Sequence, residues 1–116
     1  MVTVRAYEPE KGRVDVPGDF LKVAEHPVDG IVREVREELG VEIEVGESPI
    51  LLAPHTYGPD GTYVFATRFR TRIIEGEPNP TDGVAETRWI SMEEIDDTDF
   101  AWEHDRGFVR AALEDA

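Results

Sequence analysis

The stretch that decides the fold and the chemistry of this chain is GDFLKVAEHPVDGIVREVREELGV, residues 18–41. Within it, Pro27 suits the first position of a helix, where its missing N–H would have no intrahelical partner. Gly40 stands where a glycine commonly ends a helix in the left-handed conformation. The stretch therefore predicts a helix over residues 27–39, entered by a loop that begins at Pro17-Gly18.

One face of this predicted helix is acidic. At about 100° per residue, Glu37 and Glu38 fall within roughly 60° of Glu34, so three carboxylates converge on one face. The apolar residues 28, 31, 32, 35 and 39 form a separate stripe, which we expect to face the core. Carboxylates at these spacings repel one another, whereas a hard divalent cation held between them would reverse that effect. The pattern predicts a cation site on the helix.

The same stretch resembles the Nudix box. The pattern of the box is Gly, five residues, Glu, seven residues, Arg-Glu, an aliphatic residue, any residue, Glu-Glu, any residue, Gly and an aliphatic residue. Asp19 replaces the first glycine, and the other eight constrained positions match: Glu25, Arg33, Glu34, Val35, Glu37, Glu38, Gly40 and Val41. The later segment Glu86-Thr87-Arg88-Trp89-Ile90 is similar to a strand of the family, so the resemblance extends over nearly the whole chain.

The resemblance implies an enzyme that cleaves a phosphoanhydride bond in a nucleoside diphosphate derivative, such as ADP-ribose, with Mg²⁺ or Mn²⁺. The expected metal ligands are Glu34 and Glu38, with Glu37 as a further ligand or a ligand through water. The backbone carbonyl of Gly18 could add one oxygen. The expected partner is a small-molecule nucleotide.

Three other residues of the box are expected to support it. The resemblance implies that Arg33 anchors carboxylates such as Glu25 and does not touch the substrate. Gly40 is expected to end the helix. An acidic, solvated helix face would explain the carboxylates alone, but it would not explain these three residues at their spacings.

The general base is left open by the sequence. Several Nudix enzymes carry a glutamate six residues before the position of Trp89, and that position is Gly83 here. The predicted catalytic residues are therefore Glu37 and Glu38 of the helix, with Glu86 as the nearest substitute for the missing glutamate. Asp19 and Gly83 also indicate an alternative function. The chain would then be a catalytically impaired Nudix-fold module with a nucleotide-binding or regulatory role.

Two tyrosines are candidates for substrate binding. Tyr57 and Tyr63 flank the predicted hairpin turn at 58–61 and could stack on a base. Cross-strand or core packing is the alternative role for both rings. Trp89 is expected in the core. The three histidines, His26, His55 and His104, are too scattered for a zinc motif and are expected on the surface.

The chain is expected to form one α+β domain over residues 1–116. Alternating apolar residues and turn signals predict strands at 2–7, 14–16, 41–45, 50–53, 63–74 and 87–90 and a second helix at 108–113. The resemblance implies a Nudix fold, a mixed sheet sandwiched between helices (α/β/α). The strand that usually precedes residues 2–5 inside that sheet is lacking. A mis-set start codon, strand exchange in a homodimer, or another segment in its place would each account for this.

The amino-acid composition limits the classes of function and the cellular location that we expect. With 26 acidic and 12 basic residues the formal net charge is -14, which repels a nucleic-acid backbone. The absence of cysteine excludes disulfides and thiolate metal sites. Short apolar runs and no signal-peptide pattern indicate a cytoplasmic protein that does not span a membrane. Acidic residues throughout and only two lysines are typical of an extreme halophile, the alternative being an ordinary acidic bacterial protein.

Overall fold

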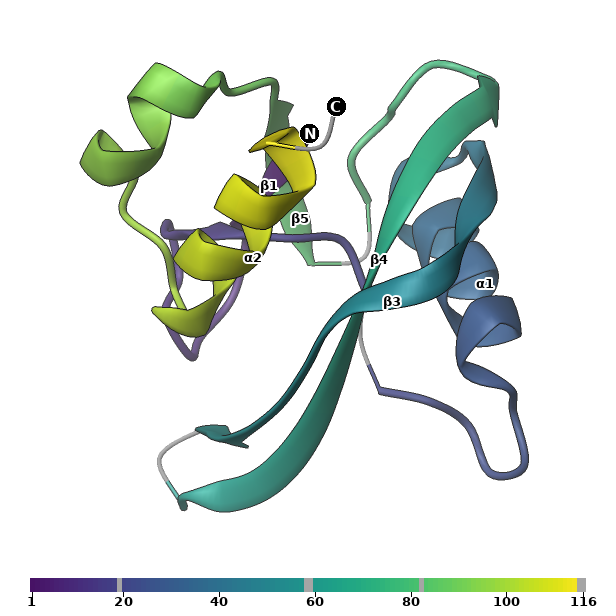
Figure 1. Ribbon diagram of the computed structural model, residues 1–116, viewed down its shortest axis with the longest axis horizontal. Coiled ribbons are helices and arrows are strands. Elements are labelled where there is room, and N and C mark those ends of the chain that lie inside the picture. The colour runs from purple at the N-terminus through teal and green to yellow at the C-terminus, as the bar shows by residue number, and fades with distance from the viewer. Residues whose placement is uncertain (19, 58–59, 82, 115–116) are drawn as a thin grey trace.

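The computed structural model describes residues 1–18, 20–57, 60–81 and 83–114, with the side chains of 51–53, 55 and 57 outside the description (Figure 1). The class is α+β, as the sequence predicts. No helix in these ranges is long and apolar enough to cross a membrane. The elements in chain order are β1 (Val2–Arg5), β2 (Val14–Asp15), α1 (Pro27–Leu39), β3 (Glu42–Tyr57), β4 (Thr62–Glu75), β5 (Val84–Arg88), the 3₁₀ helix η1 (Met92–Asp97) and α2 (His104–Glu114).

The strands form two sheets where the sequence predicts one. One sheet has the order β2-β1-β5, and the other is the hairpin of β3 and β4. All pairs of named strands are antiparallel. Among the described residues, Val14 and Phe100 also form an isolated parallel bridge. β1 pairs on both edges, with Thr3 facing Asp15 on one side and Thr87 on the other, so neither edge of β1 is open to the hairpin. Figure 1 shows the long hairpin passing between α1 and α2.

Each helix covers its own apolar cluster. The stripe of α1 buries Val35 and Leu39 against Val41 and Ile43, as its spacing predicts. The second cluster joins the three-stranded sheet to η1 and α2, and its buried members are Val2, Val14, Ile95, Phe100, Phe108 and Val109. The hairpin and α1 therefore supply most of one core, and the small sheet and α2 supply most of the other, with Ile50 of β3 and Val84 of β5 packing on the cluster of the other sheet.

The largest differences from the predicted boundaries concern β3, α2 and β5. The strands predicted at 41–45 and 50–53 are parts of the continuous β3, which passes Gly46–Pro49 through shifts in register. A bulge can accommodate a proline within a strand because it leaves ladder hydrogen bonds unmade. α2 begins at His104, four residues before the predicted start. The carboxylate of Asp105 in its first turn interacts favourably with the positive end of the helix dipole. β5 ends at Arg88, so Trp89 lies beyond the strand.

Candidate functional site

The ends of α1 are fixed by their own caps. The Nδ1 atom of His26 accepts a hydrogen bond from the backbone N–H of Val28 at 3.1 Å. At the other end Gly40 has φ 70°, in the left-handed region, and its N–H donates to the carbonyl of Arg36. The predicted bounds of the helix and the predicted role of Gly40 are therefore confirmed.

A loop that follows β4 also holds the C-terminal end of α1. The N–H of Asn79 donates to the carbonyl of Leu39, and the N–H of Thr81 donates to the carbonyl of Glu38, each at 2.8 Å. The hydroxyl of Thr81 donates to the carbonyl of Glu37 at 2.8 Å. The last carbonyls of a helix have no intrahelical donors, so this loop satisfies them. The segment that leads to Gly83 is thereby fixed against the acidic end of α1.

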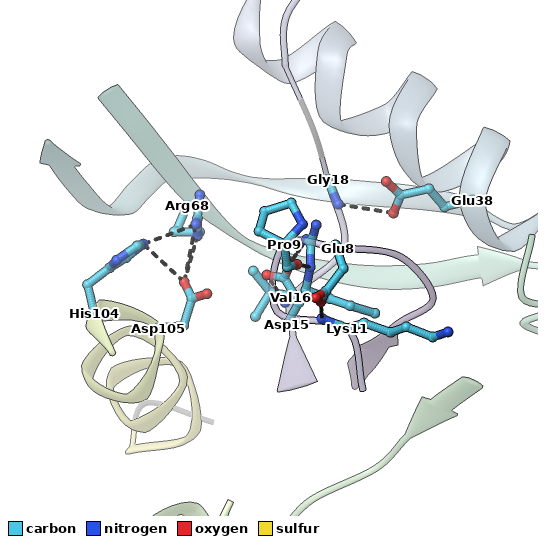
Figure 2. A network of polar contacts seen from close by, with 11 residues as sticks. Glu8, Pro9, Lys11, Asp15, Val16, Gly18, Glu38, Arg68, His104 and Asp105 are labelled. Atoms are coloured by element: carbon cyan, nitrogen blue, oxygen red, sulfur yellow. Dashed lines mark hydrogen bonds and ion pairs between the residues drawn. The ribbon is translucent and has the colours of Figure 1, made fainter. Parts of the chain in front are cut away.

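The acidic face of α1 presents two buried carboxylates. Glu34 and Glu38, one turn apart, are 9% and 8% exposed, and both line a cleft. The Oε2 atom of Glu38 accepts a hydrogen bond from the N–H of Gly18 at 3.1 Å, which holds the loop entering the box against the helix (Figure 2). The side chain of Glu37 is 46% exposed, pairs with Arg33 and is not among the described residues that line the cleft. A role for the carbonyl of Gly18 stays a prediction.

Arg33 joins three carboxylates. Its Nε and Nη2 atoms donate to the two oxygens of Glu25, at 2.7 and 2.9 Å. Its Nη1 atom lies 2.6 Å from Oε1 of Glu34 and 3.1 Å from Oε2 of Glu37. The hydrogen bonds from Arg33, and after them the backbone N–H of Lys22, lower the pKa of Glu25 to about 2. These carboxylates raise the pKa of Arg33 further above its usual range. The contacts agree with the anchoring role that the resemblance implies.

The donor set fits a hard divalent cation. Among the described residues no group of three or more acidic or histidine side chains is arranged to hold a metal ion, and Asp19 lies outside them. Mg²⁺, however, commonly binds one or two carboxylates and takes its other oxygens from water and substrate phosphates. Glu34 and Glu38 supply two such carboxylates in the wall of the cleft. Buried like charges one turn apart are costly, and a cation between them would lower that cost.

The cleft itself has a volume of about 1340 Å³, larger than most small-molecule sites. Besides the two carboxylates it is lined by Trp102 and by two arginines that sequence analysis missed, Arg5 and Arg68. The guanidinium of Arg5 donates to Asp15 at 2.8 Å and lies over the ring of Trp102, 5.5 Å from its centroid. The cleft therefore has an acidic side on α1 and arginines elsewhere on its wall.

Some predicted site residues lie away from this cleft. Glu86 is exposed on β5, and its carboxylate accepts a hydrogen bond from Arg88. Tyr63 is exposed on β4 and is not among the described residues that line the cleft. The side chain of Tyr57 lies outside the described residues. Gly83 does line the cleft, with φ 91°.

Two expectations from the sequence are wrong. Trp89 is 72% exposed and lines the cleft, whereas the sequence places it in the core. The ring follows the end of β5, and the apolar cluster of the small sheet is already filled by Phe100 and Phe108. His104 is half-buried between β4 and α2, because it opens a helix that starts before the predicted residue.

Comparisons with known proteins show the family and the fold of this chain. A family model described as the NUDIX domain matches residues 1–112. A "MutT-like protein" of Streptomyces ambofaciens is 28% identical over 86 residues, which are 74% of this chain and 53% of that protein. The chain thus spans about half the length of this curated relative.

Solved structures share the fold. A MutT protein from Methanosarcina mazei Go1 matches with TM-score 0.78 and 21% identity, covering 98% of this chain and 82% of its own. A NUDIX hydrolase from Nitrosomonas europaea matches with TM-score 0.76 and 24% identity, covering 97% and 61%. A MutT NUDIX hydrolase from Burkholderia pseudomallei matches with TM-score 0.71 and 22% identity, covering 79% and 72%.

Proposed function

Since the chain belongs to the NUDIX domain family, we propose that it hydrolyses a phosphoanhydride bond in a nucleoside diphosphate derivative, such as ADP-ribose, with Mg²⁺ or Mn²⁺. The observation that carries the proposal is the pair of buried carboxylates, Glu34 and Glu38, in the wall of a cleft large enough for a nucleotide. A net charge of -14 favours a small nucleotide over a nucleic acid as the ligand, because one bound cation can offset the charge of a diphosphate.

In this proposal Glu34 and Glu38 hold the cation, and Glu37 contributes through water. A bound divalent cation would neutralise phosphate oxygens and lower the pKa of water. Glu38 is kept in place by the N–H of Gly18, and Glu34 by the guanidinium of Arg33. Arg33 is in turn held by both oxygens of Glu25, so its position does not depend on the ligand. These contacts set the two carboxylates before a substrate arrives.

The proton of the attacking water is proposed to go to a carboxylate of α1. Glu37 has the solvent exposure, 46% of its side chain, that proton exchange requires. Glu86 is less suited, because it lies on β5, whereas Glu37 shares α1 with the two carboxylates of the cleft. The helix is therefore the proposed source of both the cation ligands and the base.

A panel of nucleoside diphosphate derivatives, incubated in molar KCl with and without Mn²⁺, tests this proposal. Chromatography of the products should show metal-dependent cleavage by the wild type and little or none by Glu38→Gln. The matched control is Glu44→Gln, which removes an exposed carboxylate of β3 that pairs with Arg72. It should cleave as the wild type does. Equal cleavage by Glu38→Gln would contradict the assignment of the site.

A binding or regulatory module is the second candidate. Two observations favour it: the position of the family's glutamate is Gly83, and Glu86 does not reach the cleft. Such a module would be stabilised against heat by one of the nucleotides and would release no product from any of them. The same panel separates the two candidates when melting temperatures are recorded beside the chromatograms.

A further inference from the structure

The far end of the hairpin projects beyond both helices (Figure 1). Nearer the body, β4 is held by the first turn of α2, because Nε of Arg68 donates to Oδ1 of Asp105 at 3.2 Å and Nη2 lies 3.3 Å from Nε2 of His104. Residues 62–67, the distal segment of β4, contribute no member to either apolar cluster of the described chain. A two-stranded hairpin alone is marginally stable in water. The distal segment would therefore gain from a further packing partner.

The side chains that the distal segment presents to water are large and aromatic. Tyr63 is 71% exposed and Phe65 is 68% exposed. They are two positions apart, so they share one face of the strand. Their neighbours across the hairpin, Thr56 and Pro54, are exposed as well. Phe65 borders the cleft, whereas Tyr63 does not line it, so this aromatic face extends beyond the candidate site.

The outer edge of the distal segment is open. Within the described parts of the chain, β3 and β4 pair with each other and with no third strand. The edge of β3 is unsuited to another strand, because Pro49 and Pro54 lack N–H donors and the register shifts around Pro49. Residues 62–67 pair with β3 without a shift and contain no proline and no charged residue. Edge strands usually carry such residues where pairing with another chain is prevented.

The distribution of charge indicates what pairs with this edge. Residues 48–67 contain one acidic residue, Asp60, and no lysine or arginine, although 33% of the whole chain is charged. The net charge of -14 repels nucleic acids and anionic lipid surfaces, and a basic peptide would be attracted to the acidic surface elsewhere. Two copies of the chain also repel each other, and least where this uncharged end of the hairpin meets its own counterpart. The occupant that fits the edge is a second copy.

We propose that residues 62–67 of β4 are a self-association surface, at which two copies pair antiparallel about a two-fold axis and join their hairpins into one four-stranded sheet. With the axis at Val64, Tyr63 of each copy lies opposite Phe65 of the other, as a two-fold contact requires. Aromatic pairs at such positions stabilise a sheet. The prolines of β3 at the outer edges end the sheet at two copies. The surface is independent of the proposed hydrolysis.

Sedimentation equilibrium in molar KCl, which screens the repulsion between copies, tests the inference. The mass of the wild type should rise with concentration from that of one 13.1 kDa chain to that of two, and no further. Phe65→Glu removes a ring from both cross-strand pairs and should raise the dissociation constant of the dimer at least about tenfold. The control Ile74→Glu replaces a side chain of β4 that is 57% exposed and lies away from the distal segment, and it should leave that constant unchanged.

A second variant, Tyr63→Lys, covers a failure of Phe65→Glu to fold, which far-UV circular dichroism would reveal. It places a lysine on the edge and should also favour the monomer. Amide hydrogen exchange locates the contact, because the amides of residues 62–67 should exchange more slowly as the concentration of the wild type rises, while those of residues 71–75 should not. A wild type with the mass of one chain at every concentration, a mass above two chains, or a dimer that Tyr63→Lys leaves intact would overturn the inference.

Discussion

Replacing Glu38 with Gln should change the stability of the protein in opposite directions with and without metal. The substitution keeps the shape of the side chain and removes one of two buried charges that lie one helical turn apart. At an effective dielectric constant of about 20 and a separation of roughly 6 Å, two such charges repel by about 3 kcal/mol. Part of this repulsion is offset by the charge of Arg33, which pairs with Glu34, and by screening in molar salt. Metal-free Glu38→Gln should therefore be more stable by about 1 kcal/mol.

Saturating metal should reverse the order. A ligand at about a hundred times its Kd stabilises the folded state by about 2.7 kcal/mol. For a domain of 116 residues 1 kcal/mol shifts the Tm by roughly 4 °C. The wild type should thus gain on the order of 10 °C from Mn²⁺. Glu38→Gln, which retains one of the two buried carboxylates, should gain little.

The measurement is a set of thermal melts followed by circular dichroism, in EDTA and across a titration of Mg²⁺ or Mn²⁺. Glu86→Gln is the control, because it removes an exposed carboxylate outside the cleft and should keep the full response to metal. A metal-induced shift of equal size in Glu38→Gln and the wild type would refute the cation site. A metal-free variant that melts below the wild type would refute the calculated repulsion.

Three further predictions follow from the same structure. With a net charge of -14, the Tm should rise steeply from tens of millimolar towards molar KCl, and a flat Tm would contradict a halophilic origin. Glu25 has a folded pKa of about 2 against an ordinary 4.5, so its stabilising effect is fully present above about pH 4.5 and is lost as the pH falls towards 2. The free energy of unfolding of Glu25→Gln, measured by urea titration at several pH values, should therefore fall less in acid than that of the wild type. An equal fall in the two proteins would contradict this prediction. Gly83→Glu should lower the free energy of unfolding by about 1–2 kcal/mol, because φ is 91°, and should raise the rate of hydrolysis by adding a carboxylate to the cleft. The control Gly83→Ala has the same backbone strain without the carboxylate. An equal rate of hydrolysis in the two variants would exclude residue 83 as a position for the general base.

The parts of the fold that the sequence predicted depend on neighbours in the chain. The bounds of α1 follow from Pro27 and Gly40, and its buried face follows from the spacing of residues such as Val35 and Leu39. Each of these signals acts within about two helical turns. The carboxylates of the candidate site could be predicted for the same reason, since Glu34 and Glu38 share one helix.

The parts that were missed depend on pairings between distant residues. The sequence gives no signal that β1 pairs with β2 on one edge and with β5, more than 80 residues away, on the other. This pairing leaves β4 without a neighbour in the small sheet and divides the predicted single sheet in two. The exposure of Trp89 follows from the same arrangement, because β5 ends before this residue.

The contacts of Arg68 were not predicted because they join two elements, β4 and α2. It lies in an alternating strand in which Arg68, Arg70 and Arg72 occupy one face, a pattern that ordinarily indicates a solvated surface. Its partners follow 36 and 37 residues later, in a segment that the sequence placed before the helix. Arg70 also reaches α2, where its Nη2 atom donates to the carbonyl of Ala112 at 3.4 Å. The arginines of β4 are thus the polar contacts that join the hairpin to α2.

The two sides of the cleft consequently rest on different apolar clusters. Glu34 and Glu38 project from the helix that packs on Val41 and Ile43, whereas Asp105 belongs to the helix that packs on Phe100. Arg68 and Arg70 connect β4 to α2 by hydrogen bonds, and the partly buried Ile50 of β3 and Val84 of β5 each pack on the cluster of the other sheet. A substrate bound in the cleft, which residues of both α1 and β4 line, would add a further connection. Binding should therefore raise the cooperativity of unfolding as well as the Tm, because the ligand ties the two clusters together.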